Sequence, residues 1–316
     1  MHKIIFYIWY KLPKFLLIFL LPLSAIYFLI ITIRKYFLTN IFSSYKSQSN
    51  IIIIGNLNVG GSGKTPFTMW LANYFKNNEK KIAIVSSGYG SKVTLPEKID
   101  NDSTPEMVGD ESILLYEKTQ VTVISGNNRV SSTKYLEDDK YDYIIHDDGL
   151  QHYRLHRQQE FILIKHDTNK NNNYLLPCGP LREPMSFHPN AQYILSNYKG
   201  NDVPGFYSRL TKIRAGKSGA LYELNDNKFL NASLITAIAD NHALIEELKT
   251  YNVTLKYLTF PDHYQFKEND IPITNEAILV TEKDFVKIKC FNMDNIYILE
   301  QEILPNEKLV KLIHNL

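Results

Sequence analysis

The stretch "IIIIGNLNVGGSGKTPF", Ile51–Phe67, joins a continuous apolar run to a glycine-rich turn and a Lys-Thr pair. Four consecutive isoleucines predict a buried β-strand, because a strand covered on both faces shows no polar alternation. The glycine-rich turn and the segment after it predict a loop that leads into a helix N-terminus. Main-chain N–H groups converge at such a junction and favour a bound phosphate. The stretch therefore predicts an α/β fold with a nucleotide-binding loop.

The loop matches the Walker A pattern G-x-x-x-x-G-K-[ST] in all but its first position. Asn58 replaces the first glycine, while Gly60 and Gly61 lie inside the loop. Asparagine tolerates left-handed backbone angles better than most residues, so we expect the turn to survive. We expect Lys64 to neutralise the phosphates of ATP and Thr65 to bind Mg²⁺. The predicted nucleotide-binding residues are Asn58, Val59, Gly60, Gly61, Ser62, Gly63, Lys64 and Thr65.

Apolar runs alternate with helical segments along most of the chain. Such alternation is typical of a parallel sheet covered by helices, and "GALYELN" with its neighbours predicts short antiparallel strands in between. We therefore predict two α/β units joined near residues 200–230. The predicted strands are Ile51–Ile54, Lys81–Ser86, Val121–Ile124, Tyr143–His146, Phe161–Ile164, Ser233–Ala239, Thr254–Tyr257, Ala277–Thr281 and Asn295–Glu300. The predicted helices are Thr65–Asn77, Asp110–Lys118, Ala243–Tyr251 and Glu307–His314.

Two acids end an apolar strand in "YDYIIHDDGLQH", Tyr141–His152. A carboxylate at this edge of a parallel sheet is the Walker B arrangement, which faces Mg²⁺ beside the phosphate loop. Asp147 and Asp148 alternate sides, so one can hold metal while the other faces the acceptor. We assign Asp147 to the metal and Asp148 to catalysis, with the reverse assignment open. A simple Asp-Asp-Gly turn is the structural alternative.

Two further motifs offer groups for proton transfer. Asp110, in "VGDES", is either a helix N-cap or a general base on an attacking hydroxyl. His263 follows Asp262 in "FPDHYQF", and a histidine beside a carboxylate can tune such a base. A kinase needs positioning, charge neutralisation and a carboxylate near the nucleophile, and these residues supply the carboxylate.

The remaining polar motifs have competing interpretations. "VTEKD", Val280–Asp284, either resembles a capping box or makes a contact with the nucleotide base or the hinge. "LLPCGPLREP", Leu175–Pro184, predicts a rigid loop that presents Arg182 and Glu183. Arg182 can hold an anionic substrate through two hydrogen bonds, and Arg129 is a second candidate anion contact.

The N-terminal region stands apart from the rest of the sequence. Phe15–Ile33 carries no charge and approaches the ~20 residues that span a hydrocarbon core. Pro22 lies inside this run and is expected to kink a helix. We predict a membrane anchor that spans the bilayer or lies in one leaflet. A cleaved signal peptide and a buried core helix are the alternatives.

Composition excludes several classes of protein. A net charge of +2 gives no support for a broadly basic nucleic-acid binder. Cys178 and Cys290 are far apart and match no metal-binding spacing, so we expect two free thiols.

Seven motifs in one order resemble the tetraacyldisaccharide 4′-kinase family across essentially the whole chain. They are "GNLNVGGSGKTP", "GYG", "GDE", "HDDGLQHYRL", "GPLREP", "FPDHY" and "TEKD". The resemblance implies transfer of the γ-phosphate of ATP, with Mg²⁺, to the 4′-hydroxyl of tetraacyldisaccharide 1-phosphate, which yields lipid IVA in lipid A biosynthesis. It implies action at the cytoplasmic face of a bacterial inner membrane, on a lipid substrate and a bilayer, without nucleic acid or an obligate protein partner.

The resemblance also implies a fold and a set of functional residues. The fold is two α/β/α domains of the P-loop or Rossmann-like class joined by a β-ribbon hinge. The implied divisions are a membrane helix at residues 1–35, a kinase domain at 50–205 and a smaller domain at 206–316. Lys64, Asp110, His263 and Asp148 match the family's catalytic positions. Positions around the lipid substrate match Tyr89, Arg129, Gln151, His152, Arg182 and Glu183.

The sequence departs from the family pattern at several positions. Ser87 and Ser91 replace the arginines that usually flank "GYG", and Ser112 replaces the proline after "GDE". The usual "GIGNP" stretch is "AIADNH", Ala237–His242. These departures bear on local contacts with substrate or neighbouring loops rather than on the reaction.

Two rival functions share the phosphate loop. Partitioning-type ATPases place a signature lysine before the glycine pair, where this sequence has Val59. A membrane-anchored nucleotide switch needs no acceptor base, and Asp110 is then only a cap. Acceptor dependence separates a kinase from a switch.

Overall fold

The computed structural model describes the chain except residues 1–8, 11–13, 42–43, 167–171, 239–240 and 252. It divides into two compact units, each built from segments that are distant in sequence. Unit 1 comprises Met1–Val85, Asn128–Tyr207 and Pro305–Leu316, and unit 2 comprises Ser86–Asn127 and Ser208–Leu304. The described residues include thirteen β-strands in a mixed α/β fold.

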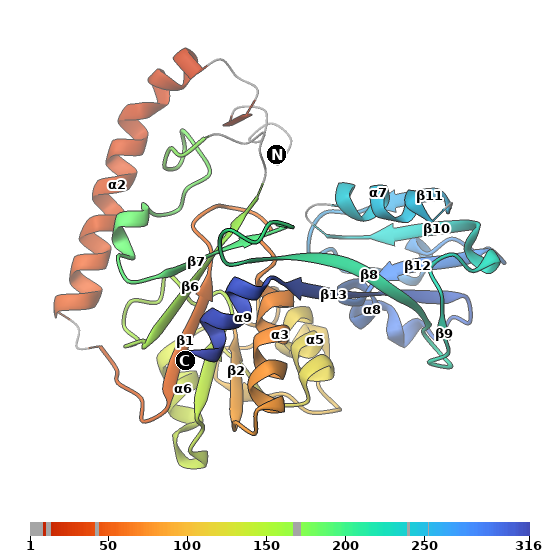
Figure 1. Ribbon diagram of the computed structural model, residues 1–316, viewed down its shortest axis with the longest axis horizontal. Helices are drawn as coiled ribbons and strands as arrows, with labels where there is room; N and C mark the ends of the chain where they lie inside the picture. The colour runs from red at the N-terminus through yellow and green to blue at the C-terminus, as the bar shows by residue number, and fades with distance from the viewer. Residues whose placement is uncertain (1–8, 11–13, 42–43, 167–171, 239–240, 252) are drawn as a thin grey trace. The chain divides into compact units, whose positions relative to one another are not determined.

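Unit 1 is organised around a parallel sheet whose central strand is β1. Ile51–Ile54 are fully buried, as expected for a strand with helices on both faces. Phe67, on the first helix after β1, stacks on Phe206 with ring centroids 5.7 Å apart, which packs that helix onto the sheet. The strands run in the order β7 (Gln192–Ser196), β6 (Gln159–Lys165), β1 (Asn50–Gly55), β5 (Tyr143–His146) and β2 (Ile82–Ser86). The other elements of this unit's core are α3 (Lys64–Asn77), α6 (Arg129–Tyr135), η3 (Glu137–Asp139), η4 (Met185–Phe187) and α9 (Glu307–His314) (Figure 1).

The N-terminal apolar segment is helical but changes its geometry along its length. It comprises η1 (Lys14–Leu20), α2 (Leu21–Tyr36) and η2 (Phe37–Ile41), and α2 is the long red helix in Figure 1. Pro22 lies in the first turn of α2, where no main-chain N–H is needed, directly after the change from η1 to α2. The kink expected there stays a prediction. Leu17–Ile41 is long and apolar enough to cross a membrane, and 17% of an apolar 18-residue window within it is buried.

α2 forms hydrogen bonds with the rest of unit 1, and many of its apolar side chains are exposed. The hydroxyl of Ser24 donates to the carbonyl of Leu175 at 3.0 Å, and that of Tyr27 donates to the carbonyl of Arg182 at 2.8 Å. The large exposed apolar residues of the segment are Ile18, Phe19, Leu21, Leu23, Ile26, Phe28, Leu29, Ile30, Ile33, Tyr36, Phe37 and Ile41. The buried core helix of the sequence analysis does not fit so much exposed apolar surface.

Unit 2 contains a set of parallel strands and two antiparallel strand pairs. Its parallel strands are β11 (Thr254–Thr259), β10 (Asn231–Thr236), β12 (Ala277–Thr281) and β13 (Ile296–Pro305). The antiparallel pairs are β8 (Gly205–Ala215) with β9 (Leu221–Tyr222), and β3 (Glu97–Lys98) with β4 (Thr122–Ser125). Its helices are α4 (Pro105–Val108), α5 (Asp110–Thr119), η5 (Asn227–Phe229), α7 (His242–Thr250), η6 (Glu268–Asp270), α8 (Glu282–Ile288) and η7 (Lys289–Phe291).

The predicted α/β pattern is confirmed, with strands and helices at all the expected positions. The antiparallel pairing of β8 and β9 is also confirmed. The sequence analysis missed the short elements β7, α6 and α8. In the structure, residues 86–127 belong to the same compact unit as residues 208–304. The predicted domains, 50–205 and 206–316, instead place residues 86–127 in the first domain. Those domain boundaries stay a prediction.

Candidate active site

The phosphate loop ends in a left-handed turn at the start of α3. Gly63 has φ +79° and ψ 26°, and Gly60 has φ +115°. Side-chain-bearing residues rarely adopt these angles, so both positions favour glycine. A Cβ on Gly63 would also lie 3.4 Å from the ring of Phe206. The turn leaves the first main-chain N–H groups of α3 available for an anion, with the positive end of the helix dipole behind them.

Asn58 serves this loop in a different way from the one predicted. Its φ is not positive, so the left-handed turn expected there is wrong. It forms an antiparallel bridge with Leu181 instead, and the N–H of Val59 donates to the carbonyl of Pro180 at 2.9 Å. The side chain of Asn56 spans the loop by donating to the carbonyls of Asn58 and Gly60 at 2.8 and 3.1 Å. Asn56 is a loop-shaping residue that the Walker pattern does not include.

Lys64 is held in the loop by polar partners from the two neighbouring strand ends. Its Nζ lies 3.2 Å from Oδ1 of Asn56 and 3.6 Å from Oδ1 of Asp148. Burial would raise the pKa of Asp148, but Lys64, Arg182 and Arg129 outweigh it and lower that pKa. Asp148 is therefore an ionised partner for the ammonium of Lys64 at neutral pH.

Asp147 is oriented by two hydroxyls of α3. The hydroxyl of Thr68 donates to Oδ1 at 2.8 Å, and that of Thr65 lies 3.4 Å from Oδ2. The main-chain N–H of Asp147 donates to the carbonyl of Val85 at 3.0 Å, which fixes the strand end. The structure thus brings together the predicted metal pair. A hydroxyl and a carboxylate are hard oxygen donors, which suit Mg²⁺ when phosphate and water oxygens complete its shell.

Arg182 joins this network rather than standing free in its loop. Its Nη2 donates to the carbonyl of Asn56 at 2.7 Å and also to Oδ1 of that residue, and it lies 3.5 Å from Oδ1 of Asp148. The guanidinium therefore adds positive charge beside the phosphate loop. Its predicted contact with substrate stays a prediction.

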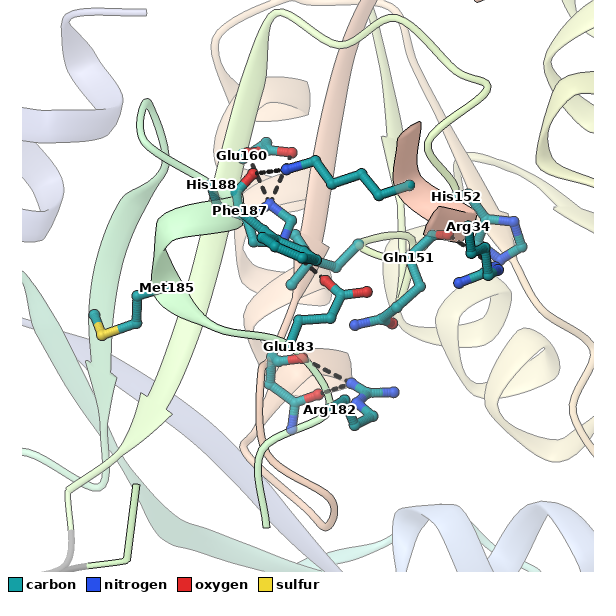
Figure 2. Close-up of polar contacts among 12 residues, drawn as sticks. Arg34, Gln151, His152, Glu160, Arg182, Glu183, Met185, Phe187 and His188 are labelled. Carbon is teal, nitrogen blue, oxygen red and sulfur yellow. Dashed lines mark hydrogen bonds and ion pairs between the residues drawn. The ribbon is translucent and has the colours of Figure 1, made fainter. Parts of the chain in front are cut away.

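Glu183 is buried and paired with a histidine. Its Oε2 lies 2.9 Å from Nε2 of His188, whose Nδ1 lies 3.3 Å from Oε2 of Glu160 (Figure 2). Burial would lower the pKa of His188, but the two carboxylates outweigh it and raise that pKa. The pair is one that sequence reasoning missed, because His188 carries no motif of its own.

Gln151 and His152 lie beside the end of α2. The carbonyl of Gln151 accepts from Nη2 of Arg34 at 3.3 Å, and Nε2 of Gln151 has no hydrogen-bond partner among the described residues. Burial lowers the pKa of His152 to about 4, assisted by Arg129, Arg34 and Arg157. His152 is therefore neutral at pH 7 and can donate or accept a hydrogen bond.

Arg129 lies beneath the strand end that carries the two acids. It is 1% exposed, and its guanidinium donates to the carbonyl of Val85 at 3.0 Å, to that of Asp147, and to that of Asp148 at 3.4 Å. Burial lowers its pKa to about 10, against the opposing effect of the two aspartates. This geometry is that of a structural support. The contact of Arg129 with substrate stays a prediction, and the hydrogen bonds of its guanidinium to main-chain carbonyls do not support it.

Unit 2 contains the predicted proton-transfer groups. Asp110 is the first residue of α5, and Gly109 occupies the cap position with φ +91°. Its Oδ1 accepts from the N–H of Glu111 at 2.9 Å, and its Oδ2 lies 3.3 Å from Nδ1 of His263. Asp110 is thus not the N-cap itself, and the predicted carboxylate–histidine pair is formed.

The turn around His263 is shaped to hold the imidazole. His263 has φ +58°, and its N–H donates to Oδ1 of Asp262 at 3.1 Å. Tyr89, 65% exposed, places its ring 4.7 Å from that of His263, so a predicted substrate residue lies beside this pair. Burial would raise the pKa of Asp110, but His263, Lys283 and Lys287 outweigh it and lower that pKa to about 2. Asp110 is therefore ionised throughout the neutral range.

The "TEKD" motif is a helix start. The hydroxyl of Thr281 accepts from the N–H of Asp284 at 3.1 Å and donates to Oδ2 of the same residue at 2.7 Å. The interpretation of a side-chain cap is confirmed. Part of the divergent "AIADNH" stretch, residues 239–240, lies outside the described residues.

Arg129→Met is expected to destabilise the protein by about 2 kcal/mol or more, because it removes the guanidinium donor from the main-chain carbonyls of Asp147 and Asp148. Lys134→Met, an exposed change on the same helix, is the control and is expected within about 0.5 kcal/mol of the native protein. Thermal unfolding of both variants measures this effect. A native unfolding temperature for Arg129→Met, together with a raised KM for lipid, would identify Arg129 as a substrate contact instead.

Known proteins match the chain over nearly its whole length. The family described as tetraacyldisaccharide-1-P 4′-kinase matches residues 16–316. A tetraacyldisaccharide 4′-kinase of Pseudoalteromonas translucida is 33% identical over 313 residues, covering 98% of this chain and 95% of the relative. One from Wigglesworthia glossinidia brevipalpis is 35% identical over 316 residues, covering 97% of this chain and 86% of the relative.

A solved structure supports the same relationship. The crystal structure of LpxK from Aquifex aeolicus in complex with ATP is similar, with a TM-score of 0.77 and 28% identity. The alignment covers 95% of this chain and 99% of that chain. On the sequence matches and the fold together, the chain belongs to the tetraacyldisaccharide 4′-kinase family.

Proposed function

We propose that the protein transfers the γ-phosphate of ATP to the 4′-hydroxyl of tetraacyldisaccharide 1-phosphate, which gives lipid IVA in lipid A biosynthesis. Membership of the family supports the reaction. The observation in the structure that carries it is the pair of buried Asp110 and half-buried His263, in a chain with a phosphate loop at Gly60–Thr65. A carboxylate beside a histidine suits a hydroxyl acceptor, and the loop suits a triphosphate donor.

The phosphate chain of ATP is assigned to the loop before α3. Main-chain N–H groups there can donate hydrogen bonds to phosphate oxygens. Lys64 adds an ammonium group, which Asn56 and Asp148 hold in place. Charge on the transferring phosphoryl group spreads over its outer oxygens in the transition state, so this fixed positive charge lowers the barrier.

Mg²⁺ fits the pair of Thr65 and Asp147. Among the described residues no group of three His, Cys, Asp or Glu side chains could hold a metal by itself. This agrees with a Mg²⁺ ion that relies on phosphate and water oxygens for most of its shell. When bound, Mg²⁺ neutralises charge that develops on the phosphate oxygens. Asp147 is assigned to the metal, and Asp148 to the orientation of Lys64.

Asp110 is assigned as the group that receives the proton of the 4′-hydroxyl. It is ionised, and Oδ2 lies 3.3 Å from the imidazole of His263, which restricts its rotation. A weakly basic carboxylate is sufficient, because the phosphoryl transfer is loose and the hydroxyl proton leaves late. Tyr89, Gln151, His152, Arg182 and Glu183 are proposed to surround the lipid head, as the family resemblance implies.

β8 and β13 are proposed as the ribbon hinge between an N-terminal kinase domain and a smaller second domain. Two of the four passages of the chain between the compact units lie within β8, at Tyr207–Ser208, and at the end of β13, at Leu304–Pro305. The other two are at Val85–Ser86 and Asn127–Asn128. Within unit 2, Arg209 pairs with Glu302 and Arg214 pairs with Glu300, so side chains tie the two strands together. Closure about such a hinge would exclude water from the reacting groups.

The segment Leu17–Ile41 is proposed to anchor the protein at the cytoplasmic face of the inner membrane. Its exposed apolar residues and the basic pair Arg34 and Lys35 at the end of α2 suit the boundary between acyl chains and head groups. Such an anchor lets the acyl chains of the substrate remain in the bilayer.

The rival functions have less support. The sequence has Val59 where a partitioning-type ATPase needs a lysine. A nucleotide switch does not need the Asp110–His263 pair.

Incubation of the purified protein with ATP and tetraacyldisaccharide 1-phosphate in mixed micelles tests the reaction. The expected product is a bisphosphorylated lipid, heavier by one phosphate in mass spectrometry. ATP turnover by the folded protein without any phosphorylated lipid would support the switch and contradict the kinase.

Asp110→Ala is expected to lower kcat by about 100-fold or more, while the Kd of ATP changes less than about threefold. The reason is that the carboxylate acts on the acceptor and not on the nucleotide. Asp102→Ala, an exposed change in the same unit, is the control. Parallel losses of turnover and ATP affinity would make Asp110 a structural residue.

The double variant Ile26→Glu/Ile30→Glu tests the anchor without removing the contacts of α2 with unit 1. Both residues are exposed and lie one helical turn apart. Two carboxylates in the apolar face are expected to reduce cosedimentation with anionic vesicles and to reduce activity on vesicle-borne lipid, with ATP binding preserved. Leu95→Glu, an exposed apolar position outside the helix, is the control. Native vesicle binding by the double variant would reject the anchor.

A further inference from the structure

A lysine of α8 is buried beside Asp110, and the reaction above does not use it. The side chain of Lys287 is 1% exposed. Its Nζ lies 3.3 Å from Oδ2 of Asp110 and 3.5 Å from Oδ1 of Asp284. A buried ammonium is costly unless carboxylates pair with it, so this position needs both partners.

Asp284 fixes the place of that ammonium. It is fully buried, and its Oδ2 accepts from the hydroxyl of Thr236 at 2.8 Å and the N–H of Ala237 at 3.2 Å. The hydroxyl of Thr281 donates to the same oxygen at 2.7 Å. With Oδ2 occupied by three donors from β10 and the start of α8, Oδ1 is left to face Lys287. Lys287 follows Asp284 by one helical turn, so the two side chains share a face.

The carboxylate of Asp110 is in turn held from two sides. Lys287 and His263 both approach Oδ2 at 3.3 Å, and the N–H of Glu111 occupies Oδ1. The first two are ion-pair distances without hydrogen-bond alignment. Lys287 and His263 attract the carboxylate but form no hydrogen bond with Oδ2. Oδ2 can therefore still accept a hydrogen bond from a hydroxyl.

The other cation of the cluster has different partners. Nζ of Lys283 lies 2.9 Å from Oε1 of Glu111, 3.4 Å from Oδ1 of Asp262 and 3.4 Å from Nε2 of His263. It therefore supports the turn and the imidazole. Among the described residues, Lys287 is the lysine that forms an ion pair with Asp110 itself.

We propose that Lys287 is a positioning residue for Asp110: its buried ammonium, fixed by Asp284, holds the carboxylate ionised and oriented beside His263. This inference rests on the proposed role of Asp110 in the kinase reaction. It adds a residue that no motif of the sequence analysis assigned to the site.

The charges around Asp110 explain why this ammonium is needed. α5 contributes Asp110 and Glu111, and the 260–266 turn contributes Asp262 and His263. α8 contributes Lys283, Asp284 and Lys287. Burial favours the protonated acid at Asp110, and three nearby carboxylates favour it further. The two lysines and His263 oppose this, so loss of Lys287 is expected to raise the pKa of Asp110 from its low value near 2.

Lys287→Met tests the proposal, because methionine has a similar length but no charge. The ionisation of Asp110 is measured from its carboxyl ¹³C resonance, in full-length protein with labelled aspartate in detergent micelles. The resonance of Asp110 is identified as the one that is missing in the Asp110→Asn variant. The titration is expected to move to higher pH by about one unit or more. The acid limb of the kcat profile should move in the same direction, with kcat near pH 7.5 about 10-fold lower and the KM of ATP within about twofold.

Lys289→Met is the matched control, because Lys289 is partly exposed and pairs with Glu117. Its titration and kcat are expected to equal those of the native protein. Lys287→Arg retains the charge, so its titration is expected to remain within about 0.3 units of the native one. An unchanged Asp110 titration in folded Lys287→Met would overturn the proposal.

Lys287→Met leaves Asp284 buried without its cation, so that variant can fail to fold. Lys287→Met/Asp284→Asn removes the unpaired carboxylate as well, and the same upward shift is expected in it. The resonance reports Asp110 whether or not that residue accepts the hydroxyl proton. The two proposals are therefore tested by different measurements. Retained turnover in Asp110→Ala would contradict the role of Asp110 in the kinase reaction, whereas the titration tests the role of Lys287.

Discussion

The left-handed turn at Gly63 is the constraint on which the phosphate site depends. It ends the loop that follows a fully buried strand and directs the first N–H groups of α3 to one place. A side chain at this position would be strained, because φ is +79°. Once α3 starts there, Thr65 and Thr68 face Asp147, and Lys64 reaches the end of β1. The positions of the residues proposed to hold Mg²⁺, Thr65 and Asp147, and of Lys64 thus follow from one backbone conformation.

Near this turn, the charged side chains of Lys64, Asp148 and Arg182 each contact another polar or charged side chain. Asn56 connects the loop, Lys64 and Arg182, and Asp148 balances both cations. Arg129 supports the same strand end through main-chain carbonyls. In unit 2, Asp284 holds Lys287, and Lys287 holds Asp110. Charges fixed in advance need little reorganisation when the phosphoryl group moves, which is the main source of electrostatic catalysis.

The sequence predicted those features that local patterns determine. β1, the loop and α3 followed from an apolar run, glycines and helical periodicity, and the Asp110–His263 pair followed from family motifs. Short elements such as α6, α8 and β7 escaped because five to seven residues give little periodicity. The burial of Arg129 and Lys287 could not be predicted from the sequence either. An arginine at position 129 looked like an anion contact, and Lys287 looked like an ordinary helix lysine, because tertiary packing decides what each one faces.

Asn58 shows the same limit within a recognised motif. The missing glycine suggested a left-handed asparagine, yet strand-like pairing with Leu181 gives that residue ordinary backbone angles. The loop is closed by Asn56, two positions earlier, through hydrogen bonds that no pattern encodes. A motif therefore locates the phosphate site, whereas its detailed construction depends on partners elsewhere in the chain.

The central claim is that the phosphate loop and the Asp110–His263 pair serve one transfer to a lipid hydroxyl. The ratio of ADP formed to lipid phosphorylated, followed in a single turnover of bound ATP, tests it most directly. The account predicts one ADP for each phosphorylated lipid, and negligible ADP when a lipid lacking the 4′-hydroxyl replaces the substrate. ADP release at the same rate with either lipid would contradict it.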